Sequence, residues 1–259
     1  MRYLISLIIL AACGLFSRAE SSLIQQADSA YTADNFKEAA DTYLHVIATE
    51  GNSAALQYNL GNCYYRLGEM GKAILAYERA LRFDPTFDDA RTNLEFINSK
   101  ITDRPGERGT FLGNALDSIA NTARSNSWAW IGFACFVLTL LGVLAYLFSD
   151  IIVVRKIGFF GGLLTFFGCI CFIFLAFRSA AIATAENVAI ITSPSTILST
   201  SPRVPKDRTQ EAMLLHEGTR VEILDSVRST TDSINSLWYD VQVDNTHRAW
   251  INAAAVEKI

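Results

Sequence analysis

Two uninterrupted apolar runs constrain this chain more than any other feature of its sequence. The first covers residues 128–148, the second covers residues 157–177, and neither contains a charged side chain. Each has about 21 residues, which is enough for an α-helix to cross the hydrocarbon core of a bilayer. Because the segment between them is too short for a domain, the pair predicts a helical hairpin that returns the chain to the side of the membrane it came from.

Charges and aromatic residues around the hairpin predict its orientation. Arg155 and Lys156 lie in the expected connection, residues 149–156, and basic residues in short connections favour the cytoplasmic side. Trp128 and Trp130 would then lie at the outer interface as aromatic anchors. The chain is therefore predicted to be a two-pass protein of a bacterial inner (cytoplasmic) membrane, with both soluble regions in the periplasm.

Gly158 and Gly162 form a pair of small residues four positions apart in the second apolar run. This spacing lets two membrane helices approach closely. Packing against the first run of the same hairpin and contact with another membrane protein both fit the pattern.

Residues 1–19 have the layout of a signal peptide. Arg2 precedes an apolar core over residues 3–16, and Ala19 is a small residue suited to the position before a cleavage site. Cys13 offers an alternative, because the residues around it resemble a bacterial lipoprotein box. Either route exports the domain that follows.

Composition limits the chemistry of the soluble regions. The net charge is −4, so no basic stripe is available to displace counterions from a nucleic acid, and no nucleic-acid partner is predicted. Cys63 alone among the five cysteines belongs to a soluble region, which excludes a disulfide framework there. The others fit as small apolar side chains within apolar segments; they are Cys13, Cys135, Cys169 and Cys171.

Residues 20–101 repeat themselves at a spacing of 34, the length of a tetratricopeptide repeat, which is a helix–turn–helix unit. Small residues at the helix crossings and a proline after the second helix are typical of this unit. Two full units are expected, followed by a capping helix within residues 86–101. The aligned pairs are Ala27 with Gly61, Tyr31 with Tyr65, Ala39 with Ala73, and Tyr43 with Tyr77.

Arrays of this kind present a concave face built from the first helix of each unit. By resemblance to other arrays, Tyr58, Asn62, Tyr65 and Arg66 are expected on that face as a peptide-binding groove. Arg66 and Asn62 would hold a carboxylate or the backbone of an extended segment. The alternative is a solvated helix face without a ligand.

Residues 102–127 form a linker that begins with Pro, Gly and charged residues. Apolar residues then recur at helical spacing, which predicts an amphipathic helix. It would lie on the outer leaflet before the first membrane run, or would pack under the repeat domain. The apolar residues are Phe111, Leu112, Ala115, Leu116, Ile119 and Ala123.

The C-terminal region, residues 186–259, changes to a strand pattern. Short β-prone stretches separated by turn residues predict a small all-β barrel. The segment 215–221, with Trp238–Tyr239 and residues 249–251, resembles the bacterial SH3 domain; Ala249 and Thr246 depart from its usual turn chemistry. The strands are expected at residues 188–191, 219–224, 238–243 and 248–251.

Trp238, Tyr239 and Trp250 are candidates for an aromatic surface of this SH3-like domain that binds peptides. In exported bacterial proteins such domains often contact cell-wall peptides, so the resemblance makes peptidoglycan a possible ligand. The alternative is that at least one of the two tryptophans belongs to the core.

No catalytic or metal-binding pattern accompanies these modules. His45, His216 and His247 have no Cys, Asp or Glu neighbours at metal-ligand spacing. Nucleophile elbows, phosphate loops and dinucleotide fingerprints are absent from the sequence. The sequence therefore predicts no enzyme, no catalytic residue, no metal and no cofactor.

The order of the modules resembles the Bat aerotolerance protein E family. The supporting motifs are residues 59–62 (Asn-Leu-Gly-Asn), residues 84–85 (Asp-Pro), residues 89–95, and the Trp238/Trp250 pair. The resemblance implies a periplasm-facing adaptor in a membrane complex linked to stress tolerance. It also implies von Willebrand A-type membrane proteins as partners, because such proteins are encoded together with that family.

The predicted fold class is a multidomain membrane protein with an all-α tetratricopeptide array, a two-helix transmembrane hairpin and a C-terminal SH3-like barrel. Three functions fit it. The first is a non-catalytic scaffold that binds other membrane proteins. The second is a cell-wall sensor, and the third is a membrane redox component that uses Cys135, Cys169 or Cys171.

Overall fold

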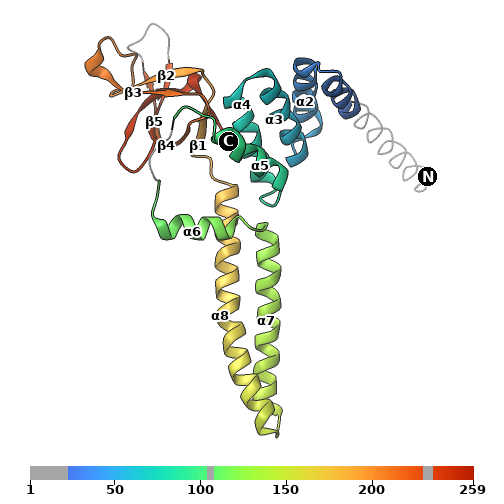
Figure 1. Cartoon of the computed structure of the whole chain (residues 1–259). Helices are drawn as coiled ribbons and strands as arrows, with labels where there is room; N and C mark the ends of the chain where they lie inside the picture. The colour runs from blue at the N-terminus through green and yellow to red at the C-terminus, as the bar shows by residue number, and fades with distance from the viewer. Residues whose placement is uncertain (1–22, 104–107, 230–235) are drawn as a thin grey trace, which may run out of the picture. The chain divides into compact units, whose positions relative to one another are not determined.

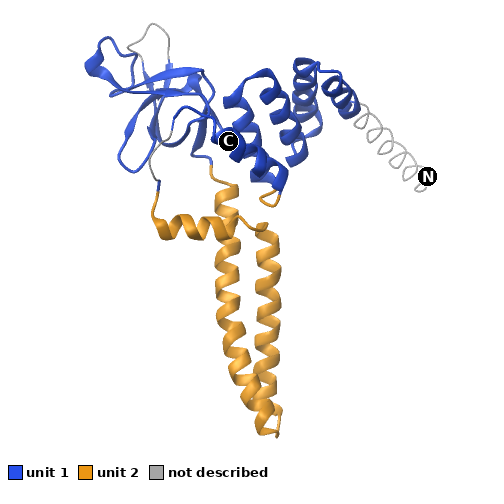
Figure 2. Cartoon of the chain, viewed as in Figure 1, with its two compact units in different colours: residues 1–83, 87–108, 186–259 blue, residues 84–86, 109–185 orange. Residues whose placement is uncertain are grey.

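The structure is a computed structural model that describes residues 23–103, 108–229 and 236–259 (Figure 1). The predicted signal peptide, residues 1–19, lies outside the described residues. The chain divides into two compact units (Figure 2). One unit holds residues 1–83, 87–108 and 186–259, and the other holds residues 84–86 and 109–185.

The first unit begins with a helical array. Residues 23–32 are helical and are followed by α2 (Phe36–Glu50), α3 (Ala54–Leu67), α4 (Met70–Phe83) and α5 (Asp88–Asn98). These helices form two helix–turn–helix pairs and one further helix, as the 34-residue period predicts.

Small residues allow the helices of the array to cross closely. A Cβ atom on Gly61 of α3 would lie 2.7 Å from the ring of Tyr77 on α4, so a larger residue would push these helices apart. Gly68 ends α3 in the left-handed conformation with φ of 81°, which suits glycine because it has no Cβ. Pro85 follows the end of α4, where it cannot continue the helix.

The C-terminal region is an antiparallel sheet with the order β3-β2-β6-β5-β4-β1-β7. Its core consists of buried side chains such as Val221, Val241 and Ile251. The strands are β1 (Val188–Ile191), β2 (Ser195–Ser199), β3 (Glu211–His216), β4 (Arg220–Ser229), β5 (Ser236–Gln242), β6 (Arg248–Asn252) and β7 (Val256–Lys258).

This sheet differs from the predicted barrel in two ways. The terminal strands β3 and β7 do not pair with each other in the described part of the chain, so the barrel is not closed. The prediction also missed β2, β3 and β7. β2 is rich in serine and threonine and β7 has three residues, so neither carries the apolar alternation that marks a strand.

The array and the sheet belong to one compact unit because they share a tight interface. Ile190 of β1 is fully buried in the same apolar cluster as Ile74 of α4. Gly218, with φ of 86°, lies so close to Ile74 that an added Cβ would come within 2.6 Å of its Cδ1 atom. On the other side of the contact, a Cβ on Gly71 would lie 2.7 Å from the carbonyl oxygen of Ile191.

Polar contacts complete this interface. The carboxylate of Asp103 accepts hydrogen bonds from the backbone N–H of His216 (2.5 Å) and from the hydroxyl of Thr219 (2.8 Å), and it lies 2.9 Å from Nδ1 of His216. The carboxylate of Glu217 accepts from the backbone N–H of Gly71 (2.9 Å) in the first turn of α4, where the helix dipole favours a negative charge. Burial opposes the charged form of Asp103, but the hydrogen bonds from His216 and Thr219 outweigh it and lower its pKa.

The second unit contains α6 (Phe111–Ala120), α7 (Ser125–Phe148) and α8 (Ile152–Ala183). Within the described residues, α7 and α8 are the two helices long and apolar enough to cross a membrane. They extend beyond the predicted runs, and the predicted connection of residues 149–156 shortens to residues 149–151. Arg155 therefore lies in the first turn of α8, where its Nε donates to the carbonyl of Tyr146 (3.3 Å).

The glycine pair of the second apolar run packs inside the hairpin. A Cβ on Gly158 would lie 2.6 Å from the carbonyl oxygen of Gly142 on α7, and Gly162 also faces Gly142. Thr139 and Thr165 hydrogen bond to each other across the same helix pair (2.9 Å). In the structure of the single chain, the glycine pair therefore packs against α7 of the same hairpin.

Candidate protein-binding site

The four predicted groove residues lie on α3, spaced so that they share one side of the helix. Tyr58, Asn62 and Tyr65 are half-buried, and Arg66 is exposed. They do not share one set of partners: Tyr58 and Asn62 both contact Tyr77 and Asn93, whereas Tyr65 and Arg66 contact other side chains.

Asn62 supports the array from within. Its Oδ1 accepts hydrogen bonds from the hydroxyl of Tyr77 (2.6 Å) and from the amide of Asn93 (3.1 Å). The first repeat has the same bond 34 residues earlier, where the hydroxyl of Tyr43 donates to Asp28. The side-chain oxygen of Asn62 therefore already accepts hydrogen bonds that hold helices of the array together.

An aromatic and cationic patch forms where α3 meets α5. The rings of Tyr65 and Phe96 meet edge to face with centroids 6.1 Å apart. Nζ of Lys100 lies 3.9 Å from the ring centroid of Phe96 and 5.9 Å from that of Tyr65. Phe96 is 50% exposed, although a large apolar side chain normally gains by burial. We call Tyr65, Phe96 and Lys100 the α3–α5 patch.

The sequence prediction missed Phe96 and Lys100. The repeat spacing could have found them, because Phe96 lies 34 positions after Asn62 and Lys100 lies 34 positions after Arg66. Corresponding positions of successive repeats fall on the same face of an array.

Arg66 is held at the turn of the first repeat. Its guanidinium lies 4.1 Å from the ring centroid of Phe36, and its NH2 group lies 3.1 Å from Oδ1 of Asp34. The side chains of this ion pair are 46% and 76% exposed, so water screens their attraction. A carboxylate of a bound segment would compete with Asp34 for Arg66 at little cost.

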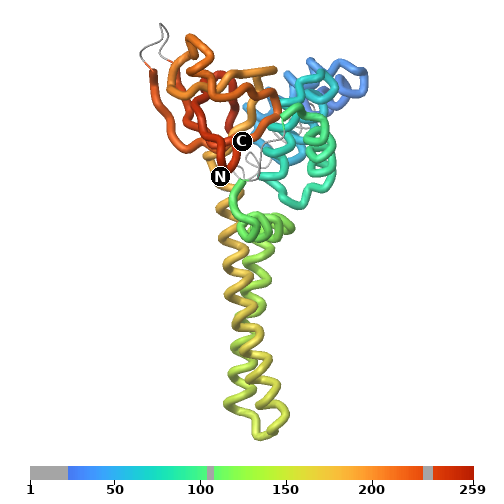
Figure 3. Tube along the Cα trace, turned by 60° about the vertical axis from the view of Figure 1, so that its left-hand side comes forward, coloured from blue at the N-terminus to red at the C-terminus, as the bar shows by residue number. Residues whose placement is uncertain are grey.

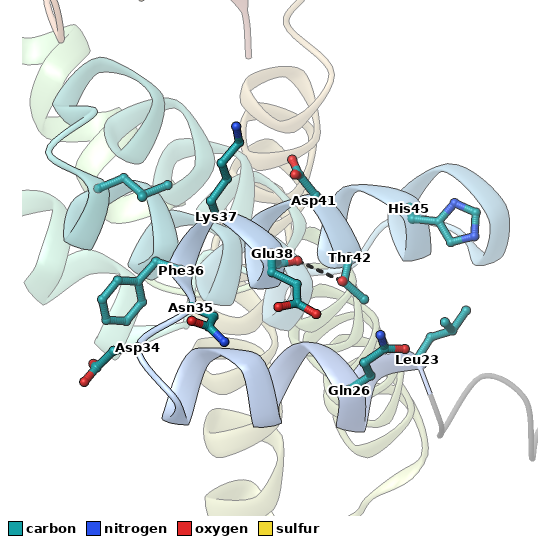
Figure 4. Close-up of a pocket in the computed structure, with 11 residues that line it drawn as sticks. Leu23, Gln26, Asp34, Asn35, Phe36, Lys37, Glu38, Asp41, Thr42 and His45 are labelled. Carbon is teal, nitrogen blue, oxygen red and sulfur yellow. Dashed lines mark hydrogen bonds between the residues drawn. The ribbon is translucent and has the colours of Figure 1, made fainter.

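A separate open groove of about 830 Å³ lies on the first repeat and has none of the four predicted residues in its lining (Figure 4). Side chains from one side of α2, including Glu38, Asp41 and His45, line it together with Gln26. The hydroxyl of Thr42 donates to the backbone carbonyl of Glu38 within this lining (2.8 Å). The groove is open to solvent, and polar and apolar side chains share its lining.

The structure does not bring the three aromatic residues of the predicted SH3-like surface together on one face. Trp238 is only 2% exposed, so one of the two tryptophans is buried. Tyr239 pairs with Ile251 and packs against the sheet core, whereas Trp250 pairs with Asp240. Neighbouring residues of a strand point to opposite faces, which separates Tyr239 from Trp238 and Trp250.

Comparison with known proteins supports the identity of the array. Residues 54–87, which contain α3 and α4, match the tetratricopeptide repeat family. The chain is also 30% identical over 88 residues to the protein CTR9 homolog of Arabidopsis thaliana. That match covers 34% of this chain and 8% of the plant protein.

The family match covers one repeat of the array and confirms the predicted tetratricopeptide repeat for residues 54–87. Such arrays are typically non-catalytic scaffolds, and their presence indicates a role in protein–protein interaction. The chain thus contains a tetratricopeptide repeat, together with an antiparallel sheet and two long apolar helices.

Proposed function

We propose that this chain is a non-catalytic, membrane-anchored adaptor whose repeat array binds an extended segment of a protein partner. The observation that carries the proposal is the α3–α5 patch. It combines a half-exposed phenylalanine and a lysine, which lie 34 residues after Asn62 and Arg66, with the edge of a tyrosine ring from α3. Aromatic anchors with an adjacent cation suit a segment that carries an apolar side chain next to a carboxylate.

The two apolar helices support the membrane part of the proposal. Gly132 is the only residue of α7 that is buried, and large side chains such as Phe136, Leu141 and Phe167 are about half-exposed. An apolar surface of this size is not stable in water, but it matches the interior of a bilayer. Because α7 and α8 form a hairpin, the repeat array and the sheet would lie on one side of the membrane.

The resemblance to the Bat aerotolerance protein E family extends this proposal to location and partners. The array and an SH3-like C-terminal domain would face the periplasm from a bacterial inner membrane. The partners would be other membrane proteins of a stress-related complex, with von Willebrand A-type proteins as the first to test.

Copurification of the tagged full chain from its native membranes tests the adaptor role. Bound chains are identified by mass spectrometry for the wild type and for the double variant Phe96→Ala with Lys100→Glu. Lys37→Glu is the matched control, because Lys37 is an exposed lysine on α2 outside the patch. We expect the same partner with the wild type and the control, and at least about tenfold less with the double variant.

Two results would refute the proposal. One is that the wild-type chain recovers no protein partner. The other is that the double variant retains the partner as well as the control does, which would place binding away from the α3–α5 patch.

A further inference from the structure

α6 carries an apolar side that none of the described residues covers. Phe111 is 89% exposed, Leu112 is 69% exposed and Ile119 is 48% exposed. Phe111, Ala115 and Ile119 recur every four residues, and Leu112 lies beside them, so these residues form one stripe along the helix. We call Phe111, Leu112 and Ile119 the α6 stripe.

Specific contacts within the second unit fix the place of α6. Nε and NH2 of Arg178 on α8 donate to the two carboxylate oxygens of Asp117 (2.5 and 2.9 Å). Nε1 of Trp128 on α7 donates to the carbonyl oxygen of Ala120 at the C-terminal end of α6 (3.1 Å). Bidentate ion pairs of this kind hold geometry as well as charge. Two views show α6 running across the axis of the hairpin near one end of it (Figures 1 and 3).

The anchoring residues mark the level of α6 along the hairpin. Arg178 is the first charged residue after the apolar run 157–177, which is about 32 Å long at 1.5 Å per residue. The hydrocarbon core of a bilayer is about 30 Å thick, so Arg178 falls at its boundary. Trp128 is the first residue of the other apolar run and its ring stacks on Phe172. Both contacts therefore hold α6 where the hydrocarbon ends and the headgroups begin.

We propose that α6 lies in the membrane interface with its stripe in contact with lipid. The inference rests on the proposed membrane anchoring and deepens it, because it gives the chain a third lipid-binding element at the outer end of the hairpin. A helix that lies in the plane of the interface buries its apolar face at the boundary between headgroups and acyl chains.

The charge of α6 defines the kind of lipid surface. Asp117 is the only charged residue in Phe111–Ala120, and Arg178 neutralises it. α6 has no lysine or arginine that would select anionic headgroups. Burial of the α6 stripe is therefore the driving force, and a zwitterionic phosphatidylcholine bilayer is sufficient.

Photolabelling of the full chain in phosphatidylcholine nanodiscs tests this inference. The probe is a phosphatidylcholine with a diazirine near the glycerol end of an acyl chain, and the labelled peptides are mapped by mass spectrometry. We expect adducts in the α7 and α8 peptides and in the peptide with residues 111–120. The double variant Leu112→Asn with Ile119→Asn should lose at least about tenfold of the α6 adducts, because each polar replacement removes most of the gain from burial.

The control variant is Asn114→Ser, which leaves the α6 stripe intact and should keep the α6 adducts. Adducts in the α7 and α8 peptides of every variant show that each chain has inserted. If α7 and α8 are labelled in the wild type but α6 is not, this inference is overturned and the anchoring proposal stands. The same holds if α6 is labelled and the double variant does not reduce that labelling. Unlabelled α7 and α8 would overturn both.

Discussion

Asp103→Ala is the most direct test of whether the array and the sheet form one cooperative unit. The carboxylate of Asp103 joins the two, because it accepts hydrogen bonds from the backbone N–H of His216 and the hydroxyl of Thr219. Its side chain is 13% exposed, and Thr219 is fully buried. The variant would leave both donors without this acceptor in a place where water has little access.

The size of the effect follows from these contacts. Hydrogen bonds to a charged group contribute roughly 1.5–3 kcal/mol, and a buried polar group left without a partner costs about 1–3 kcal/mol. Because the contacts of one carboxylate are not additive, we expect a loss of about 3 kcal/mol in the free energy of unfolding of the first unit. With a urea dependence of about 2 kcal/mol per molar, the midpoint should fall by about 1.5 M.

Urea unfolding of the full chain in nanodiscs, followed by tryptophan fluorescence, measures this change. Trp238 and Trp250 report on the sheet, and Trp128 and Trp130 lie in α7. Asp207→Ala is the matched control. Asp207 also accepts from a backbone N–H and a hydroxyl, both of Thr209, but only within an exposed local turn.

The control should change stability by less than about 0.5 kcal/mol, as surface substitutions usually do. Equal changes in the unfolding midpoint for Asp103→Ala and Asp207→Ala would refute the role of Asp103 in joining the array to the sheet. Two separate transitions of the array and the sheet in the wild type would refute a single cooperative unit.

The pKa of Asp103 is lowered from 3.8 in the folded chain. The charged carboxylate therefore stabilises the fold above about pH 4, and this stabilisation is lost as the pH falls through the folded pKa. Urea midpoints measured from pH 7 to pH 3 should fall more for the wild type than for Asp103→Asn. Gly71→Ala should destabilise the first unit by about 1–3 kcal/mol in the same assay, because its Cβ would meet Ile191, whereas alanine at Gly161, which has open space around it, should not. Burial raises the pKa of the Cys63 thiol to about 12, so iodoacetamide at pH 8 should leave Cys63 unmodified until urea unfolds the array; rapid labelling of the native chain would contradict this.

The candidate binding site was only partly predictable. Tyr58, Asn62, Tyr65 and Arg66 were selected because one helix of a repeat presents one face, and they do lie along one side of α3. What each residue does depends on its neighbours. Asn62 is used by Tyr77 and Asn93, and Arg66 is used by Asp34 and Phe36. The exposed aromatic residue of the patch, Phe96, comes from α5, two helices further along the chain.

The burial of the two tryptophans in the sheet could not be predicted from the sequence. Trp238 and Trp250 look alike in the sequence, yet Trp238 is 2% exposed and Trp250 is not buried. Their burial depends on which segments lie over each face of the sheet. A pattern of alternation within one strand cannot supply that information.

By itself the sequence determined the repeat period, the all-β character of the C-terminal region and the two long apolar helices. Each of these follows from spacings within about 35 residues, where backbone geometry sets the pattern. Only the tertiary structure decided that the array and the sheet form one unit and that the glycine pair packs within the hairpin. The first feature depends on contacts such as that of Asp103 with His216, 113 residues apart, and the second on which helix lies against the glycines; no local period encodes which surfaces fit together.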